Sequence, residues 1–63
     1  MKKDKNTIKL FEKIINWNFS DALKMQCKHA LTIYKNANSV DEISVFYSQF
    51  FSLIHLCEYY TKS

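Results

Sequence analysis

The sequence predicts an all-α protein, either a small antiparallel helical bundle of three helices or a helical hairpin with a broken first arm. The 63 residues include neither glycine nor proline, and this argues against the tight turns of an all-β protein. Apolar residues recur at helical spacing in three segments. Short clusters of Asn, Ser and Asp, which favour caps and turns, separate these segments.

Length and composition make this a marginal single domain, residues 1–63. Apolar residues form 48% of the chain, so the composition is that of a folding sequence. A domain of this size buries only about 60% of the surface of its unfolded chain. Because domains this small usually gain stability from a disulfide, a metal or a partner subunit, the first functional question is which of these applies.

The first helix is expected at about residues 7–18, after a frayed N-terminus at residues 1–6. Asn6 or Thr7 can cap it through a backbone N–H bond. Trp17 stands at the edge of the apolar arc, where it either seals a corner of the core or faces a partner. The apolar residues that recur at helical spacing are Ile8, Phe11, Ile15 and Phe19.

The second helix is expected at about residues 21–36. A cluster of turn-forming residues, 16–21, precedes it, and Ser20 or Asn18 would be its N-cap. Without Gly or Pro at this break, the first two helices could also continue as one bent helix. One slim arc of the second helix carries its apolar residues Leu23, Cys27, Ala30, Leu31, Tyr34 and Ala37.

The third helix is expected at about residues 40–61 and begins at a capping box. Asn residues before it can adopt the left-handed conformation that ends a helix. The Ser39 side chain would accept the N–H of Glu42, and the Glu42 carboxylate would reach back to the Ser39 N–H. The acids at its start also favour this end of the helix dipole.

The third helix is the expected interaction surface. No formal charge occurs from Ile43 to Cys57, and apolar residues fill about half of the helical wheel. This excess favours a partner surface, although each helix of a small bundle must also present a wide arc to the core. The predicted partner-binding residues are Val45, Tyr47, Phe50, Phe51, Leu56 and Tyr59, together with Trp17.

The sequence favours neither catalysis nor a cofactor. It has no glycine-rich phosphate loop and no nucleophile elbow, so we expect no enzyme activity. Each Cys lies two positions from a His, and residues two apart point about 200° away from each other on a helix; we therefore expect no metal site. We expect Cys27 and Cys57 to be small buried hydrophobes, with a disulfide between them left open.

The charge distribution leaves nucleic-acid binding as an alternative. Residues 1–35 carry eight Lys and three acids, whereas residues 36–63 carry one Lys and three acids. The chain has no Arg, the residue that reads guanine bidentately, so any such binding would use phosphates. The lysines that could contact phosphate or an acidic partner are Lys9, Lys13, Lys24, Lys28 and Lys35.

The apolar stretch at residues 43–57 is too short for a membrane span, which needs about 20 residues, and it contains several polar side chains. No signal peptide is visible, because the Lys-rich start leads into an amphipathic segment. We therefore expect a reduced, cytoplasmic protein.

One short segment resembles the Hha-type nucleoid modulators, small helical proteins that bind a DNA-organising protein. The matching residues are Asp41, Glu42, Val45, Phe46, Tyr47 and Ser48. The Asp-His-Arg signature of that family is replaced here by Gln49, Phe50 and Phe51, so no site residue is implied. In outline alone, the chain is also similar to the small co-chaperones of type III secretion needle subunits.

Together these observations predict a small non-enzymatic regulator or adaptor that binds protein through its aromatic-rich last helix. Self-association as a homodimer is expected, and a hetero-complex is the other form that such a surface could take. The alternatives are a nucleic-acid-associated factor that uses the Lys-rich face and a small secretion-type co-chaperone.

Overall fold

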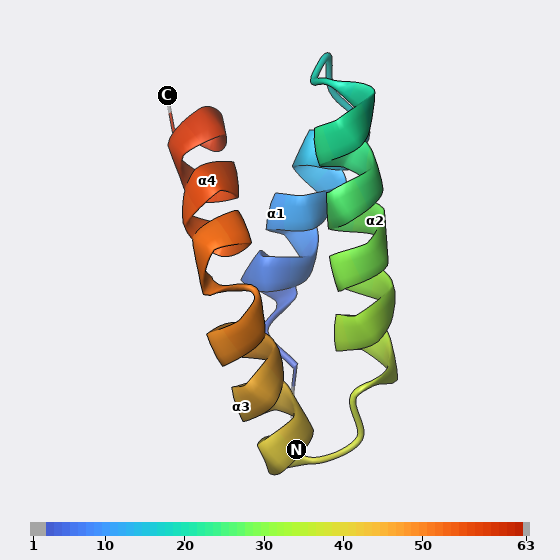
Figure 1. Cartoon of the computed structure of the whole chain (residues 1–63), viewed down its shortest axis with the longest axis vertical. Helices are drawn as coiled ribbons and strands as arrows, with labels where there is room; N and C mark the ends of the chain where they lie inside the picture. The colour runs from blue at the N-terminus through green and yellow to red at the C-terminus, as the bar shows by residue number, and fades with distance from the viewer. Residues whose placement is uncertain (1–2, 63) are drawn as a thin grey trace.

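A computed structural model describes residues 3–62, which form an all-α arrangement of four helices (Figure 1). The predicted fold class is therefore confirmed, but the predicted count of three helices is wrong. In Figure 1, α3 and α4 follow each other along one side of the molecule, α2 lies along the other side, and α1 packs behind them. The helices are α1 (Lys5–Ile15), α2 (Asp21–Asn36), α3 (Val40–Gln49) and α4 (Phe51–Thr61).

The first helix begins and ends earlier than expected. Asp4 is its N-cap and accepts the N–H of Asn6 at 2.9 Å, so neither Asn6 nor Thr7 has that role. Before the helix, Lys3 Nζ donates to the carbonyl of Lys35 at 2.8 Å. Lys5 and Asn6, which were expected in the frayed N-terminus, belong to α1, while Met1 and Lys2 lie outside the described residues.

The second helix has the bounds that the sequence predicts, Asp21–Asn36. Ser20 is the N-cap, and its hydroxyl accepts the N–H of Leu23 at 3.2 Å. The polar cluster that precedes it breaks the chain between α1 and α2, although no glycine or proline enforces the break. The two segments are therefore separate helices and not one bent helix.

The connection between α2 and α3 differs in detail from the prediction. The chain leaves α2 through Ala37 in an extended conformation, and no residue in the described part of the chain has a positive φ. The expectation that an Asn adopts the left-handed conformation at the end of this helix is therefore wrong. Ser39 does accept the N–H of Glu42 at 3.1 Å, but the Glu42 carboxylate accepts the N–H of Asn38 at 3.2 Å, not that of Ser39.

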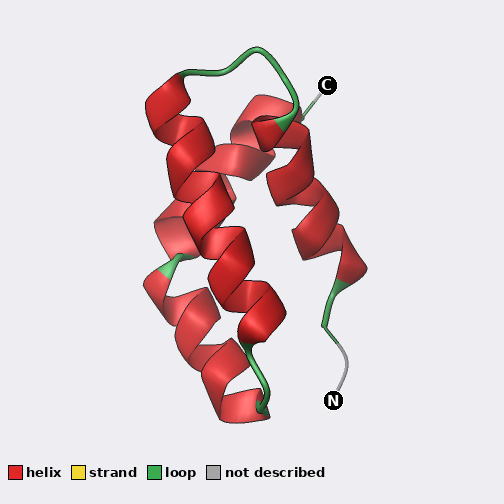
Figure 2. Cartoon of the chain, turned by 90° about the vertical axis from the view of Figure 1, so that its right-hand side faces the viewer, coloured by secondary structure: helices red, strands yellow, loops and turns green. Residues whose placement is uncertain are grey.

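A kink at Phe50 divides the single helix expected at residues 40–61. Phe50 has φ −105° and ψ 19°, outside the usual helical values. Helical hydrogen bonds continue on both sides of the kink. The Phe50 N–H donates to the carbonyl of Phe46 (2.8 Å), and the Ile54 N–H donates to the carbonyl of Phe50 (2.9 Å). Packing explains the bend: α3 contacts α2, whereas α4 leans across to contact α1 (Figure 2).

The core forms where α1 covers the other helices. Phe46 of α3 is its centre, because its ring contacts those of Phe11 (6.2 Å between centroids), Tyr34 (4.8 Å) and Phe50 (4.9 Å). Small residues on α2 let these rings approach, as its slim arc predicted. The buried core residues that form one cluster are Phe11, Ile14, Cys27, Ala30, Tyr34, Phe46 and Cys57.

Candidate functional site

Two of the predicted partner-binding residues, Tyr47 and Phe50, point inward. Both are partly buried and pack against the core cluster. The Phe50 ring lies 6.4 Å from the His29 ring of α2 in an edge-to-face arrangement. These aromatic rings therefore stabilise the contact between α2 and the arm formed by α3 and α4.

The Tyr47 hydroxyl joins three segments of the chain. It lies 2.9 Å from the hydroxyl of Tyr34 and 3.0 Å from that of Thr7, and the Tyr34 hydroxyl accepts the backbone N–H of Asp4 at 2.8 Å. Burial is the main cause that raises the pKa of Tyr47. This cluster was not predictable from the sequence, because hydroxyls so far apart in the chain have no periodic pattern.

The remaining predicted partner-binding residues are exposed, but they do not form one surface. Val45 and Leu56 border a groove between α2 and the last two helices, Phe51 and Tyr59 lie on the outer side of α4, and Trp17 lies beyond the end of α1. The exposed fractions are 71% for Trp17, 61% for Val45, 61% for Phe51, 40% for Leu56 and 74% for Tyr59.

The groove consists of two adjoining hollows of about 390 and 300 Å³ that share Gln49. We call their combined lining the bundle groove. No residue of α1 lines it, because α1 packs on the other side of these helices. The first hollow is lined by Gln26, His29, Gln49, Phe50, Ser52, Leu53 and Leu56, and the second by Ile33, Ala37, Asp41, Glu42, Val45, Phe46 and Gln49.

Formal charge in the bundle groove is confined to one end, where Asp41 and Glu42 lie. The rest of the groove has an apolar floor with amide, hydroxyl and imidazole groups between the apolar side chains. A surface with apolar anchors and few charges is typical of the centre of a protein interface. The geometry therefore suits an amphipathic helix placed along the groove.

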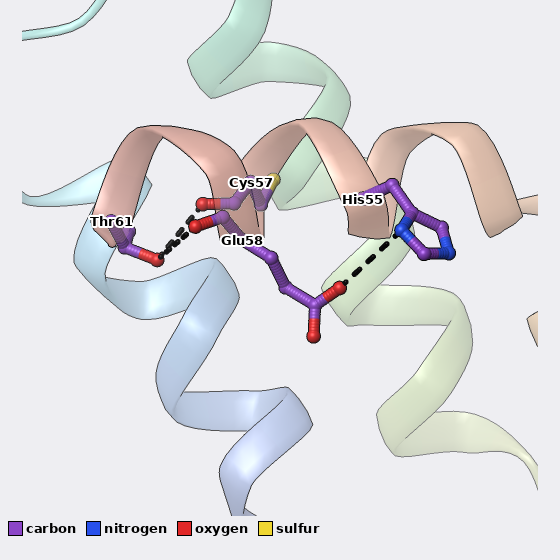
Figure 3. A network of polar contacts seen from close by, with 4 residues as sticks. All are labelled: His55, Cys57, Glu58 and Thr61. Atoms are coloured by element: carbon purple, nitrogen blue, oxygen red, sulfur yellow. Dashed lines mark hydrogen bonds and ion pairs between the residues drawn. The ribbon is translucent and has the colours of Figure 1, made fainter.

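Polar contacts also lie along α4 (Figure 3). The Phe51 ring packs against that of His55 with 4.3 Å between centroids, and His55 Nδ1 lies 3.7 Å from a Glu58 carboxylate oxygen. The Thr61 hydroxyl donates to the carbonyl of Cys57 at 2.9 Å, which helps to satisfy the end of the helix. His55 and Glu58 thus place polar groups near Phe51 on the outer side of α4.

The predicted cationic residues do not form one patch. Lys9 and Lys13 border a hollow at the C-terminal end of α1, whereas Lys24, Lys28 and Lys35 are distributed along α2. Lys24 is half-buried, and the other four are exposed. The α1 pair borders a hollow, whereas Lys24 and Lys28, also one helical turn apart, lie with Lys35 along one side of α2.

Cys27 and Cys57 are buried small residues, as predicted, with 3.5 Å between their sulfur atoms. Both are free thiols. Burial, followed by the hydrogen-bonding contact with Cys27, raises the pKa of Cys57 to about 12. Over residues 3–62, no three His, Cys, Asp or Glu side chains come together in the way that a metal ion requires.

No helix in the described part of the chain is both long and apolar enough to cross a membrane. No family model, no curated protein and no solved structure matches the chain.

Proposed function

We propose that this chain is a small non-enzymatic regulator or adaptor that self-associates through the bundle groove. The observation that carries the proposal is the exposure of Val45 (61%) and Leu56 (40%) on the groove rim, within the charge-free stretch Ile43–Cys57. Exposed apolar side chains on a surface whose charge is confined to one end favour association with another apolar surface. Binding would thus bury the rim that folding leaves in water.

The arrangement of the helices explains how a second copy would fit. α1 covers one side of α2 and the last two helices, and the bundle groove is on the other side. A helix of the second copy placed there would pack against α2 and the arm formed by α3 and α4 on the side that α1 leaves open. In a two-fold dimer the same surface serves both copies, so the Leu56 side chains would come close to the symmetry-related groove.

Sedimentation velocity of the purified chain tests the proposal. We expect a dimer for the unchanged chain and a monomer for Leu56→Lys, because the new ammonium would have to be buried without a partner. Tyr59→Lys, a change on the outer side of the same helix, is the matched control and should leave the dimer intact. Raised ionic strength should also leave it intact, because apolar contacts are not screened by salt.

A monomer for the unchanged chain at every concentration would refute self-association and leave a different protein as the partner. A dimer for Leu56→Lys that dissociates for Tyr59→Lys would instead place the interface on the outer side of α4.

A further inference from the structure

A hollow of about 600 Å³ lies at the end of the molecule where α1 and α4 finish. Its size is within the range of small-molecule sites. Figure 1 shows the first interhelical connection and the C-terminal end of α4 at this same end of the molecule. We call it the Trp17 hollow; its lining includes Lys9, Glu12, Lys13, Trp17, Phe19 and Tyr60.

The Trp17 side chain is exposed on the turn that follows α1. Its backbone N–H donates to the carbonyl of Ile14 (3.4 Å), and its carbonyl accepts the N–H of Phe19 (3.0 Å). These bonds fix the turn after α1, and the indole is 71% exposed. A ring this exposed gains little of the stabilisation that burial in the core would give. The hollow therefore presents an exposed aromatic face.

Two more aromatic side chains line the hollow. Tyr60 of α4 is 48% exposed, and its ring contacts that of Phe19 with 5.5 Å between centroids. This contact supports Tyr60 from the side of the connection between α1 and α2. Aromatic surface from two separate parts of the chain thus borders one space.

Two unneutralised cations border the same space. Lys9 and Lys13 lie one helical turn apart and are both exposed. Over residues 3–62, neither ammonium is within ion-pairing distance of a carboxylate, and this includes Glu12. Like charges at this spacing destabilise a helix slightly. An anion placed between them would remove that repulsion.

We propose that the Trp17 hollow binds a nucleobase joined to a phosphate, as found in single-stranded nucleic acid and in free nucleotides. The base stacks on Trp17 beside Tyr60, and the phosphate contacts Lys9 and Lys13. Aromatic platforms beside a cationic track are the general means of binding single strands. Without arginine in the chain, recognition uses no guanidinium fork at base edges, so binding is insensitive to sequence. Glu12 weakens the affinity but does not occupy either lysine.

The sole tryptophan of the chain gives a direct test. Fluorescence is measured while the folded protein is titrated with oligothymidylate and, separately, with thymidine monophosphate. We expect saturable quenching by the oligonucleotide that weakens as salt is raised. Quenching by the mononucleotide at equal affinity would assign the site to free nucleotides, and tighter binding of the oligonucleotide would assign it to a strand; both support the proposal. No quenching by either ligand would overturn it.

Variants locate the contacts. Lys9→Gln with Lys13→Gln should reduce the slope of log affinity against log salt by about 1.4, two phosphate contacts at about 0.7 each for single strands. Lys28→Gln with Lys35→Gln on α2 is the matched control and should leave the slope unchanged. An equal loss in both double variants would show a diffuse electrostatic field and would overturn the assignment to this hollow.

Trp17→Leu provides a readout that does not depend on tryptophan fluorescence. The affinity for a dye-labelled oligonucleotide, measured by anisotropy, should fall about tenfold because the stacking surface is removed. Circular dichroism checks that the fold is retained. An unchanged affinity would overturn the role of Trp17. Leu56→Lys should bind as the unchanged chain does, so failure of the bundle groove and failure of this hollow are distinguishable.

Discussion

Tyr47 shows why single residues on an apolar arc are difficult to assign from sequence. Its position on the third predicted helix suggested a partner contact, but its hydroxyl bonds to Tyr34 and Thr7 and its ring packs against the core. A helical wheel shows which way a side chain points and contains no information about which distant hydroxyl meets it. The exposed residues Val45 and Leu56 were predictable, because they lie outside the arc that the core needs.

Removal of the Tyr47 hydroxyl should destabilise the fold. We expect Tyr47→Phe to lower the free energy of unfolding by about 1–2 kcal/mol, because both bonding partners lose a contact in a partly buried site. Urea denaturation followed by circular dichroism measures this. The control is Tyr59→Phe at a 74% exposed position, which should change stability by less than about 0.5 kcal/mol. Equal effects for the two variants would contradict the role of the hydroxyl cluster.

The buried thiols make stability depend on pH in the alkaline range. Burial raises the pKa of Cys57 from 9.0 to about 12, so the folded chain retains a proton that the unfolded chain releases. Its contribution to stability is complete below pH 9.0 and is lost as the pH rises towards about 12. Burial raises the pKa of Cys27 as well, which acts in the same direction.

Denaturation at a series of pH values tests this. We expect the free energy of unfolding to decrease with pH above 9.0, and to decrease less steeply in Cys57→Ala than in the unchanged chain. The two slopes can be compared even though the smaller side chain also leaves a cavity. Identical slopes would show that Cys57 does not titrate differently in the folded and unfolded chains.

At the scale of elements, boundaries were predictable where side chains define them. α2 has the expected bounds because Ser20 caps its start, and α3 begins where the capping box of Ser39 and Glu42 predicted. The kink at Phe50 was not predictable, because no proline or glycine stands there. It results from the contacts that α3 makes with α2 and α4 makes with α1, and tertiary packing of this kind has no local signal.

The capping box gives a prediction for a single element. Ser39→Ala should cost about 1 kcal/mol of stability, because the Glu42 N–H loses its acceptor. Ser44→Ala is the matched control: this residue is exposed within α3, where alanine is at least as favourable as serine. Thermal unfolding of both variants measures the effect. A comparable loss of stability in Ser44→Ala would show that the loss in Ser39→Ala does not come from the cap.

At the scale of the whole molecule, the sequence predicted an apolar excess but not its distribution. A single charge-free helix suggested one binding face. In the structure, one part of that stretch is buried against α1, a second part lines the bundle groove, and a third part lies on the outer side of α4. The Trp17 hollow also depends on three-dimensional proximity, because Trp17 and Tyr60 are far apart in the chain. Their joint placement with Lys9 and Lys13 is a property of the fold alone.

The kink at Phe50 also divides the molecule into parts of unequal resistance to local opening. Cys57 is the one buried residue of α4, and the helix begins without a side-chain cap, whereas the aromatic cluster joins α1, α2 and α3. Amide hydrogens of α4 should therefore exchange with solvent through a partial opening that leaves the other three helices protected. Because Leu56 lies on α4, occupation of the bundle groove would slow this exchange. The last helix would then open only together with the other three helices.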